Sequence, residues 1–155
     1  MSNQQALDLN YLELAYEMAV LAYKEDEVPV GAVLVDPDGT IAAQCYNKKE
    51  QFQNVTAHAE ILCINQASKQ NSSWRLDGYS LYTSLEPCLM CAGAIIAARI
   101  SRVVCAALDP KGGAESCAGL FTKVHTNHSV DFIFYDIVKM QDLLKTFFRN
   151  KRKKS

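Results

Sequence analysis

The chain has 155 residues, of which 49% are hydrophobic and 21% are charged, a composition typical of one globular domain rather than of a disordered chain. No apolar run approaches the roughly 20 residues of a membrane-spanning helix. The N-terminus, MSNQQALDLN, has no apolar signal core, so we expect a cytoplasmic protein with no membrane attachment.

Hydrophobic periodicity and turn residues predict the elements in chain order. A first helix is expected over residues 10–24, with Asn10 and Glu13 as a capping pair. Strands over 30–36 and 41–46 flank a turn and predict a hairpin. The later elements are a helix over 57–70, a strand over 79–84, a helix over 87–98, strands over 102–107 and near 131–135, and a helix over 136–150. This alternation predicts a layered α/β domain with a partly parallel sheet.

Charge is distributed unevenly along the chain. The net charge is −1, but residues 145–155 carry +6 and no acidic residue, which leaves −7 on the remainder. A basic segment attached to an acidic body is typical of a protein with a polyanionic partner. The competing interpretation is a solvated, frayed terminus, and the charge pattern alone leaves both open.

Two short segments, His58–Glu60 and Pro87–Cys91, carry side chains suited to metal chemistry. A Cys-x-x-Cys pair alone is compatible with redox chemistry or with half of a structural zinc site. Structural zinc usually has four protein ligands, whereas catalytic zinc has three and a water. The sequence offers three well-placed ligands, namely His58, Cys88 and Cys91. Three further cysteines lie within apolar runs and are interpreted as core residues: Cys45, Cys63 and Cys105.

Glu60 is the candidate proton carrier. A zinc-bound water has its pKa lowered to about 7, and its attack on a ring carbon requires a group that moves protons to a ring nitrogen and to the departing amine. Side chains two residues apart on a helix point roughly 200° apart, so His58 and Glu60 can reach one centre only at a helix end. We therefore expect the site where the N-termini of two helices converge.

The pattern His-x-Glu with Pro-Cys-x-x-Cys is the signature of zinc nucleobase deaminases. The flanking residues resemble the bacterial tRNA-specific adenosine deaminases over about residues 11–149, most specifically in Leu85–Ile95 and also in Glu27–Ala32, Thr56–Ile61 and Phe147–Arg149. The resemblance implies a three-layer α/β/α cytidine-deaminase-like fold with a central mixed sheet of about five strands. It implies one zinc-dependent deaminase domain over residues 1–155 with a basic C-terminal tail at 149–155.

The resemblance also implies an activity and a set of site residues. The activity is hydrolytic deamination of adenosine to inosine at the wobble position of a tRNA anticodon stem-loop, by a homodimer with one Zn²⁺ per subunit. The matched residues are the metal ligands His58, Cys88 and Cys91, the catalytic Glu60, and the substrate-binding Asn47, Asp109 and Arg149. Leu108 and Pro110 depart from the residues that usually flank this aspartate in the family.

Two other functions remain open at this point. A guanine or cytosine deaminase that acts on a small molecule shares the metal motif but needs no basic tail. A non-catalytic RNA-binding module with structural zinc shares the ligands but has no use for Glu60.

His125 and His128 lie three residues apart in the polar loop HTNH, without a supporting acid or cysteine. We interpret them as part of a surface or RNA-facing loop rather than as a second metal site.

Overall fold

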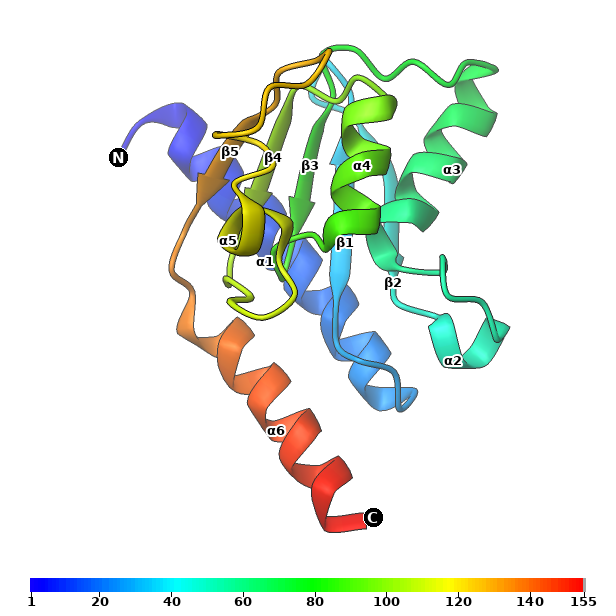
Figure 1. Ribbon diagram of the computed structural model, residues 1–155, viewed down its shortest axis with the longest axis vertical. Coiled ribbons are helices and arrows are strands. Elements are labelled where there is room, and N and C mark those ends of the chain that lie inside the picture. The colour runs from blue at the N-terminus through cyan, green and yellow to red at the C-terminus, as the bar shows by residue number, and fades with distance from the viewer. Residues whose placement is uncertain (155) are drawn as a thin grey trace.

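A five-stranded sheet forms the centre of the computed structural model, which describes residues 1–154 (Figure 1). The strands are β1 (Gly31–Val35), β2 (Ile41–Tyr46), β3 (Ser80–Thr83), β4 (Arg102–Cys105) and β5 (Asp131–Phe134), in the order β2-β1-β3-β4-β5. Strand β1 pairs antiparallel with β2 and β3, whereas β3, β4 and β5 run parallel. The predicted partly parallel sheet of about five strands is confirmed.

Helices cover both faces of the sheet and make three layers. Helices α1 (Asn3–Lys24) and α6 (Val138–Lys154) pack on one face, and α3 (Ala59–Asn71) and α4 (Leu89–Ala97) pack on the other (Figure 1). Side chains of a strand alternate between faces, and both faces of β1 are buried. Val33 and Val35 therefore join the core under α1, while Ala32 and Leu34 join the core under α3 and α4.

Helix α1 begins at Asn3, so the predicted start at residue 10 and the Asn10–Glu13 cap are wrong. The cap is a reciprocal pair: Gln5 N–H donates to Ser2 Oγ at 3.1 Å, and Ser2 N–H donates to Gln5 Oε1 at 2.9 Å. The first two turns are mostly polar, so apolar periodicity did not indicate that they are helical.

An ion pair between the buried Asp8 and the half-buried Arg102 fixes these first turns to the sheet. Asp8 is only 1% exposed, and the Arg102 guanidinium on β4 donates two hydrogen bonds to its carboxylate at 3.0 and 3.2 Å. The hydroxyls of Tyr82 and Tyr135 donate to the same carboxylate. Burial alone would raise the pKa of Asp8, but the hydrogen bonds from Arg102, Tyr82, Gln4 and Tyr135 together lower it. A buried charged residue in the first turns of the helix thus anchors α1.

Helix α1 and strand β1 approach backbone to backbone at Gly31. A Cβ on Gly31 would lie 2.2 Å from Ala15 O and 2.5 Å from Ala19 N. Only glycine fits here, and this contact sets the position of the chain between α1 and β1.

Two short helices were not predicted, α2 (Lys49–Phe52) and α5 (Ala114–Ala118). The last predicted helix begins at Val138 and continues to Lys154, so residues 149–154 extend a helix rather than form a frayed tail. Ser155, the last residue of the predicted tail, lies outside the described residues. Within residues 1–154, no helix has both the length and the apolar character to cross a membrane.

Candidate active site

The N-termini of α3 and α4 converge on one point, as the motif spacing predicted. His58 is the N-cap residue of α3 and Cys88 is the N-cap residue of α4. Within residues 1–154, neither side chain makes a hydrogen bond that caps its own helix, so both are available to a shared centre. Cys91 lies one turn further along α4 and is completely buried.

The ligand atoms of these three residues lie within 4.8 Å of one another. Nδ1 of His58 is 3.4 Å from Sγ of Cys91 and 3.7 Å from Sγ of Cys88. A tetrahedral zinc ion with the usual zinc–sulfur and zinc–nitrogen bond lengths requires separations of about 3.5–3.8 Å. The donor set of one imidazole and two thiols therefore fits zinc in its chemistry, and both separations from His58 Nδ1 lie close to the required values.

Electrostatics at this point favour a thiolate. Hydrogen bonds from Cys91 and His58 lower the pKa of Cys88 to about 3. The hydrogen bond between His58 and Cys88 also raises the pKa of His58. The hydrogen bond with Cys88 and burial raise the pKa of Cys91. The three side chains thus share charge and protons, and a divalent cation would displace the remaining protons, because thiolates are the form that binds metal.

Glu60 lies in the first turn of α3 and is 3% exposed. Within the described part of the chain, its Oε1 atom is buried and has no hydrogen-bond partner. A buried polar atom without a partner is costly, so this oxygen is suited to a group that enters the site. Burial raises the pKa of Glu60 to about 7, a shift that a bound cation would oppose. A carboxylate that titrates near neutrality can both accept and donate a proton.

A cavity of about 230 Å³ opens beside these side chains, and Asn47 and Asp109 line it together with Glu60. Asn47 is 6% exposed, and its position is fixed on both sides. Its Nδ2 donates to Val28 O at 3.2 Å, and its Oδ1 accepts a hydrogen bond from Lys49 N–H at 3.1 Å. The structure therefore brings two of the three predicted substrate-binding residues to the metal ligands.

Arg149 lies elsewhere, on the exposed surface of α6. Among the described residues, the cavity lining does not include it. Arg149 can therefore contact only a part of the substrate that extends well outside the cavity.

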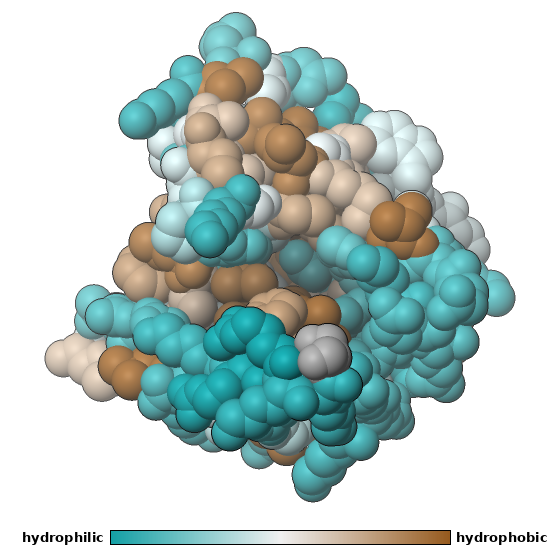
Figure 2. Space-filling view, turned by 60° about the horizontal axis from the view of Figure 1, so that its bottom comes forward, coloured by the Kyte–Doolittle hydropathy of each residue, from teal (hydrophilic) through white to brown (hydrophobic). Residues whose placement is uncertain are grey.

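A wider groove of about 630 Å³ continues from the cavity toward α6 and shares the wall residues Val28, Leu85 and Asp109 with it. The surface over α6 is hydrophilic (Figure 2). A hollow with apolar residues in its walls lies beside this surface. Among its apolar residues, Phe134 and Leu144 were not singled out in the sequence, whereas Leu108 and Phe148 stand next to the predicted substrate-binding residues Asp109 and Arg149. The position of Leu108 and Phe148 beside two predicted substrate-binding residues was the signal that could have indicated this surface.

Two buried glutamates that sequence reasoning also missed hold the walls of the cavity. Glu27 accepts hydrogen bonds from the N–H groups of Glu50 and Gln51, at 2.9 and 2.7 Å, in the first turn of α2. Glu86 accepts hydrogen bonds from the N–H groups of Asp109 and Ser116. Each carboxylate thus caps a short helix, Glu27 for α2 and Glu86 for α5, by accepting hydrogen bonds from backbone N–H groups in its first turn.

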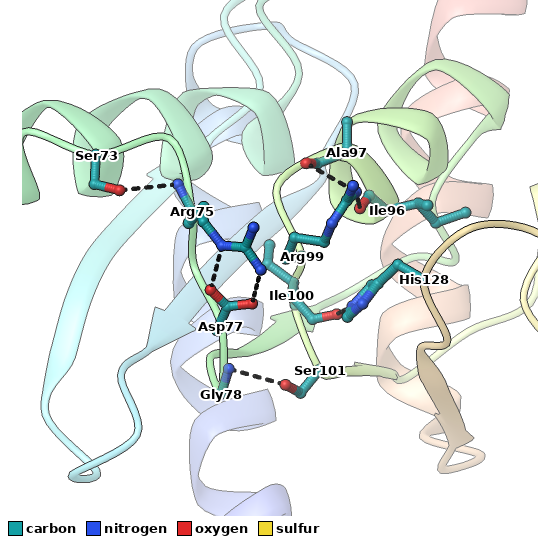
Figure 3. A network of polar contacts seen from close by, with 10 residues as sticks. All are labelled: Ser73, Arg75, Asp77, Gly78, Ile96, Ala97, Arg99, Ile100, Ser101 and His128. Carbon is teal, nitrogen blue, oxygen red and sulfur yellow. Dashed lines mark hydrogen bonds and ion pairs between the residues drawn. The ribbon is translucent and has the colours of Figure 1, made fainter.

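The histidines of the HTNH loop take no part in the site. Nε2 of His128 donates to Ile100 O at 2.8 Å, close to the ion pair of Arg75 and Asp77 (Figure 3). Among residues 1–154, the His58–Cys88–Cys91 group is the only one of its kind suited to a metal ion. The interpretation of His125 and His128 as part of a surface loop fits this arrangement.

Comparison with known proteins places this geometry in a family. Residues 5–107 match the model of the cytidine and deoxycytidylate deaminase zinc-binding region. The chain belongs to this family of zinc-dependent deaminases. The predicted enzyme class, the zinc cofactor and the three-layer cytidine-deaminase-like fold are thereby confirmed.

Individual members of the deaminase family are similar over most of the chain. A tRNA-specific adenosine deaminase of Bacillus subtilis is 42% identical over 93% of this chain and 90% of its own length. A solved structure from a study of tRNA:A34 deaminases is 44% identical, with a TM-score of 0.77, over 82% of this chain and 98% of that one. A guanine deaminase structure from Bacillus subtilis is 28% identical, with a TM-score of 0.61, over 97% and 95% of the two chains. The predicted resemblance to tRNA-specific adenosine deaminases is confirmed.

Proposed function

We propose that this deaminase converts adenosine to inosine at the wobble position of a tRNA anticodon. The observation that carries the proposal is the 44% identity to a tRNA:A34 deaminase structure, together with a cavity whose walls lead into a groove toward a basic helix. A deaminase needs its base outside the stack, and an anticodon loop presents unpaired bases that a protein can read.

In this proposal His58, Cys88 and Cys91 hold one zinc ion, which when bound makes hydroxide available near neutral pH. Glu60 takes up one proton of the attacking water and passes it to the ring nitrogen. It then takes up the second proton from the hydroxyl group added to the ring carbon and delivers it to the departing amine, which leaves as ammonia as the ring carbonyl forms. The unpartnered Oε1 atom is the group that accepts and returns these protons. Asn47 and Asp109 position the base and its neighbours from the cavity walls.

The alternative substrate is a small free base such as guanine. The weaker similarity to the guanine deaminase structure, at 28% identity, disfavours it, and so does the groove beyond the cavity, which a free base would leave empty. The deciding assay gives purified protein free bases, free nucleosides and an anticodon stem-loop, and measures ammonia and inosine. We expect inosine only in the stem-loop. Ammonia from guanine or cytosine, with an unreacted stem-loop, would refute the proposal.

We propose that the last turn of α6 and Arg149 supply RNA affinity. Shortening the chain to end at Asn150 removes Lys151–Lys154. We expect weaker stem-loop binding, a higher KM, and a log–log salt dependence shallower by about 0.7 for each phosphate that the protein no longer neutralises. The Lys151–Asp26 ion pair at 2.7 Å is exposed, so its removal costs little stability.

Single-turnover deamination across a salt series measures this effect. A full-length variant with arginine at Lys151, Lys153 and Lys154 keeps the charge and serves as the control. An unchanged salt slope in the shortened chain would mean that the segment is only a solvated helix end.

We also propose that the protein is a homodimer, with α4 in the interface. Leu89, Gly93 and Ala97 recur at every fourth residue and are exposed, Leu89 to 59%. A Cβ on Gly93 would meet no atom of the described residues within 4 Å, so a larger side chain fits the monomer. We expect Gly93→Lys to give a folded monomer in light scattering and Gly93→Ala to stay dimeric. A monomeric unmodified protein at micromolar concentration would exclude the dimer.

We further propose that residues 1–155 act as one domain in the cytoplasm, where tRNA is available. The support is a single sheet that carries both cores and every element that lines the site. Fractionation of cells that produce the protein would test its location.

A further inference from the structure

We propose that Glu86 is a positioning residue for the reaction, which holds residues 108–116 against the metal-binding helix and thereby sets where Asp109 meets the substrate. This inference rests on the proposed function, because it takes Asp109 to be a substrate contact. Glu86 itself acts only through the loop.

The first support is the set of hydrogen bonds that the carboxylate accepts. Glu86 is 2% exposed and stands two residues before the ligand Cys88. Its Oε1 accepts a hydrogen bond from Asp109 N–H at 2.9 Å, and its Oε2 accepts one from Ser116 N–H at 2.6 Å. The hydroxyl of Ser116 also donates to Oε1. One side chain thus ties together two points of the loop that are seven residues apart.

The second support is the close approach of the loop to the carboxylate. A Cβ on Gly113 would lie 2.1 Å from the carboxyl carbon of Glu86, so any larger residue at this position would displace that carboxylate. Gly113 also pairs with Cys88 as an isolated β-bridge, and Ala114 N–H donates to Pro87 O at 2.9 Å. The loop and the first residues of α4 are therefore one hydrogen-bonded unit.

The third support is the position of Asp109 in that unit. Its Oδ1 accepts hydrogen bonds from Lys111 N–H at 3.3 Å and Gly112 N–H at 3.1 Å, and its own N–H is held by Glu86. Asp109 lines both the cavity and the groove. Its backbone is fixed by the same glutamate that stands beside the metal ligands, so the cavity wall keeps a constant distance from the reacting centre.

The chemistry of the contact requires a carboxylate. Both oxygens of Glu86 face N–H donors, and a carboxylate only accepts. A glutamine has the same shape but one amide NH₂ group, which in either orientation points at the N–H of Asp109 or of Ser116. Glu86→Gln therefore removes a hydrogen bond and leaves a half-buried N–H donor facing an amide NH₂ group, with almost no change in volume.

The experiment measures Glu86→Gln on the anticodon stem-loop, with Glu115→Gln as the matched control. Glu115 lies in the same segment and accepts hydrogen bonds from Phe121 and Thr122, on a different part of the loop. In Glu86→Gln we expect about a tenfold rise in KM, full zinc content and a kcat within about threefold of the unmodified protein. The control should match the unmodified protein in all three quantities. Zinc loss or a collapse of kcat in folded Glu86→Gln would overturn the inference.

A double-mutant cycle distinguishes positioning from general stability. If Glu86 acts through Asp109, the rise in KM caused by Glu86→Gln largely disappears in an Asp109→Ala background. Additive effects would overturn the inference. Ser116→Ala removes only the hydroxyl bond, so it should fold even if Glu86→Gln does not, and we expect a rise in KM of about twofold to fivefold. An unchanged KM in Ser116→Ala together with an unfolded Glu86→Gln would also count against the inference.

Amide hydrogen exchange gives a readout that needs no substrate. The N–H groups of Asp109 and Ser116 should be protected in the unmodified protein and exchange faster in Ser116→Ala and Glu86→Gln. If the unmodified protein leaves the stem-loop unreacted, the proposed function fails. Exchange still decides whether Glu86 holds the loop, and the kinetics are then measured on the base that is deaminated.

Discussion

Replacement of Glu60 by alanine is expected to leave one zinc ion bound and the fold intact while kcat falls by at least about 10²–10⁴-fold. The reason is its position: Glu60 is buried beside the ligand group without being part of it, and its Oε1 atom is free to exchange protons with substrate. One carboxylate that serves several proton transfers accounts for a loss at the upper end of this range or beyond it.

Glu60→Gln distinguishes the loss of proton transfer from the loss of side-chain volume. It keeps the volume of the glutamate, so activity should stay as low as in Glu60→Ala. The melting temperature should be no lower than in the unmodified protein, because the replaced carboxylate is buried with an unpartnered oxygen. Turnover, zinc content and thermal unfolding are measured on the same preparations. Substantial turnover by either variant with zinc bound would contradict the assigned role.

Cys91→Ser is expected to remove zinc and, with it, all measurable deamination. Cys91 is buried in the first turn of α4, and its sulfur lies 3.4 Å from Nδ1 of His58. A serine hydroxyl does not ionise near neutral pH and so cannot replace a thiolate ligand. Two remaining ligands bind zinc weakly, and the converging helix ends lose the cation that joins them, so the melting temperature should also fall.

Cys117→Ser is the matched control, since Cys117 is exposed and lies outside the ligand group. It should retain one zinc ion per subunit by elemental analysis and full activity. Full zinc occupancy in a Cys88→Ser, Cys91→Ser double variant would show that the metal is held elsewhere.

The sequence predicted the metal group because its constraints are local. His58 and Glu60 are two residues apart, Cys88 and Cys91 are three apart, and each pair lies at the start of a helix whose apolar face was evident. The requirement that such pairs converge at helix ends then determines their arrangement from the sequence alone. The sheet followed from the spacing of apolar runs.

Long-range polar contacts account for most of what could not be predicted. Helix α2 depends on Glu27 and helix α5 depends on Glu86, both more than twenty residues earlier in the chain. The first turns of α1 depend on Asp8 and its partner Arg102, which is 94 residues away. A single sequence gives no signal for such pairs, because buried and exposed acidic residues look alike until their partners are known. The groove beside α6 was missed for a different reason, because its apolar residues, such as Leu85, Phe134 and Phe148, come from segments far apart in the chain.

The contact at Gly31 has a consequence for how mutational data on this protein would be interpreted. The side chain that any replacement introduces would push α1 away from β1. The connection between them carries Glu27, which holds α2, and Val28, which lines both the cavity and the groove. In a scan of all positions scored by activity, Gly31 would therefore rank with the metal ligands although it touches no substrate. A position can therefore be intolerant to substitution because it lacks space for a side chain, and not only because its residue takes part in the reaction.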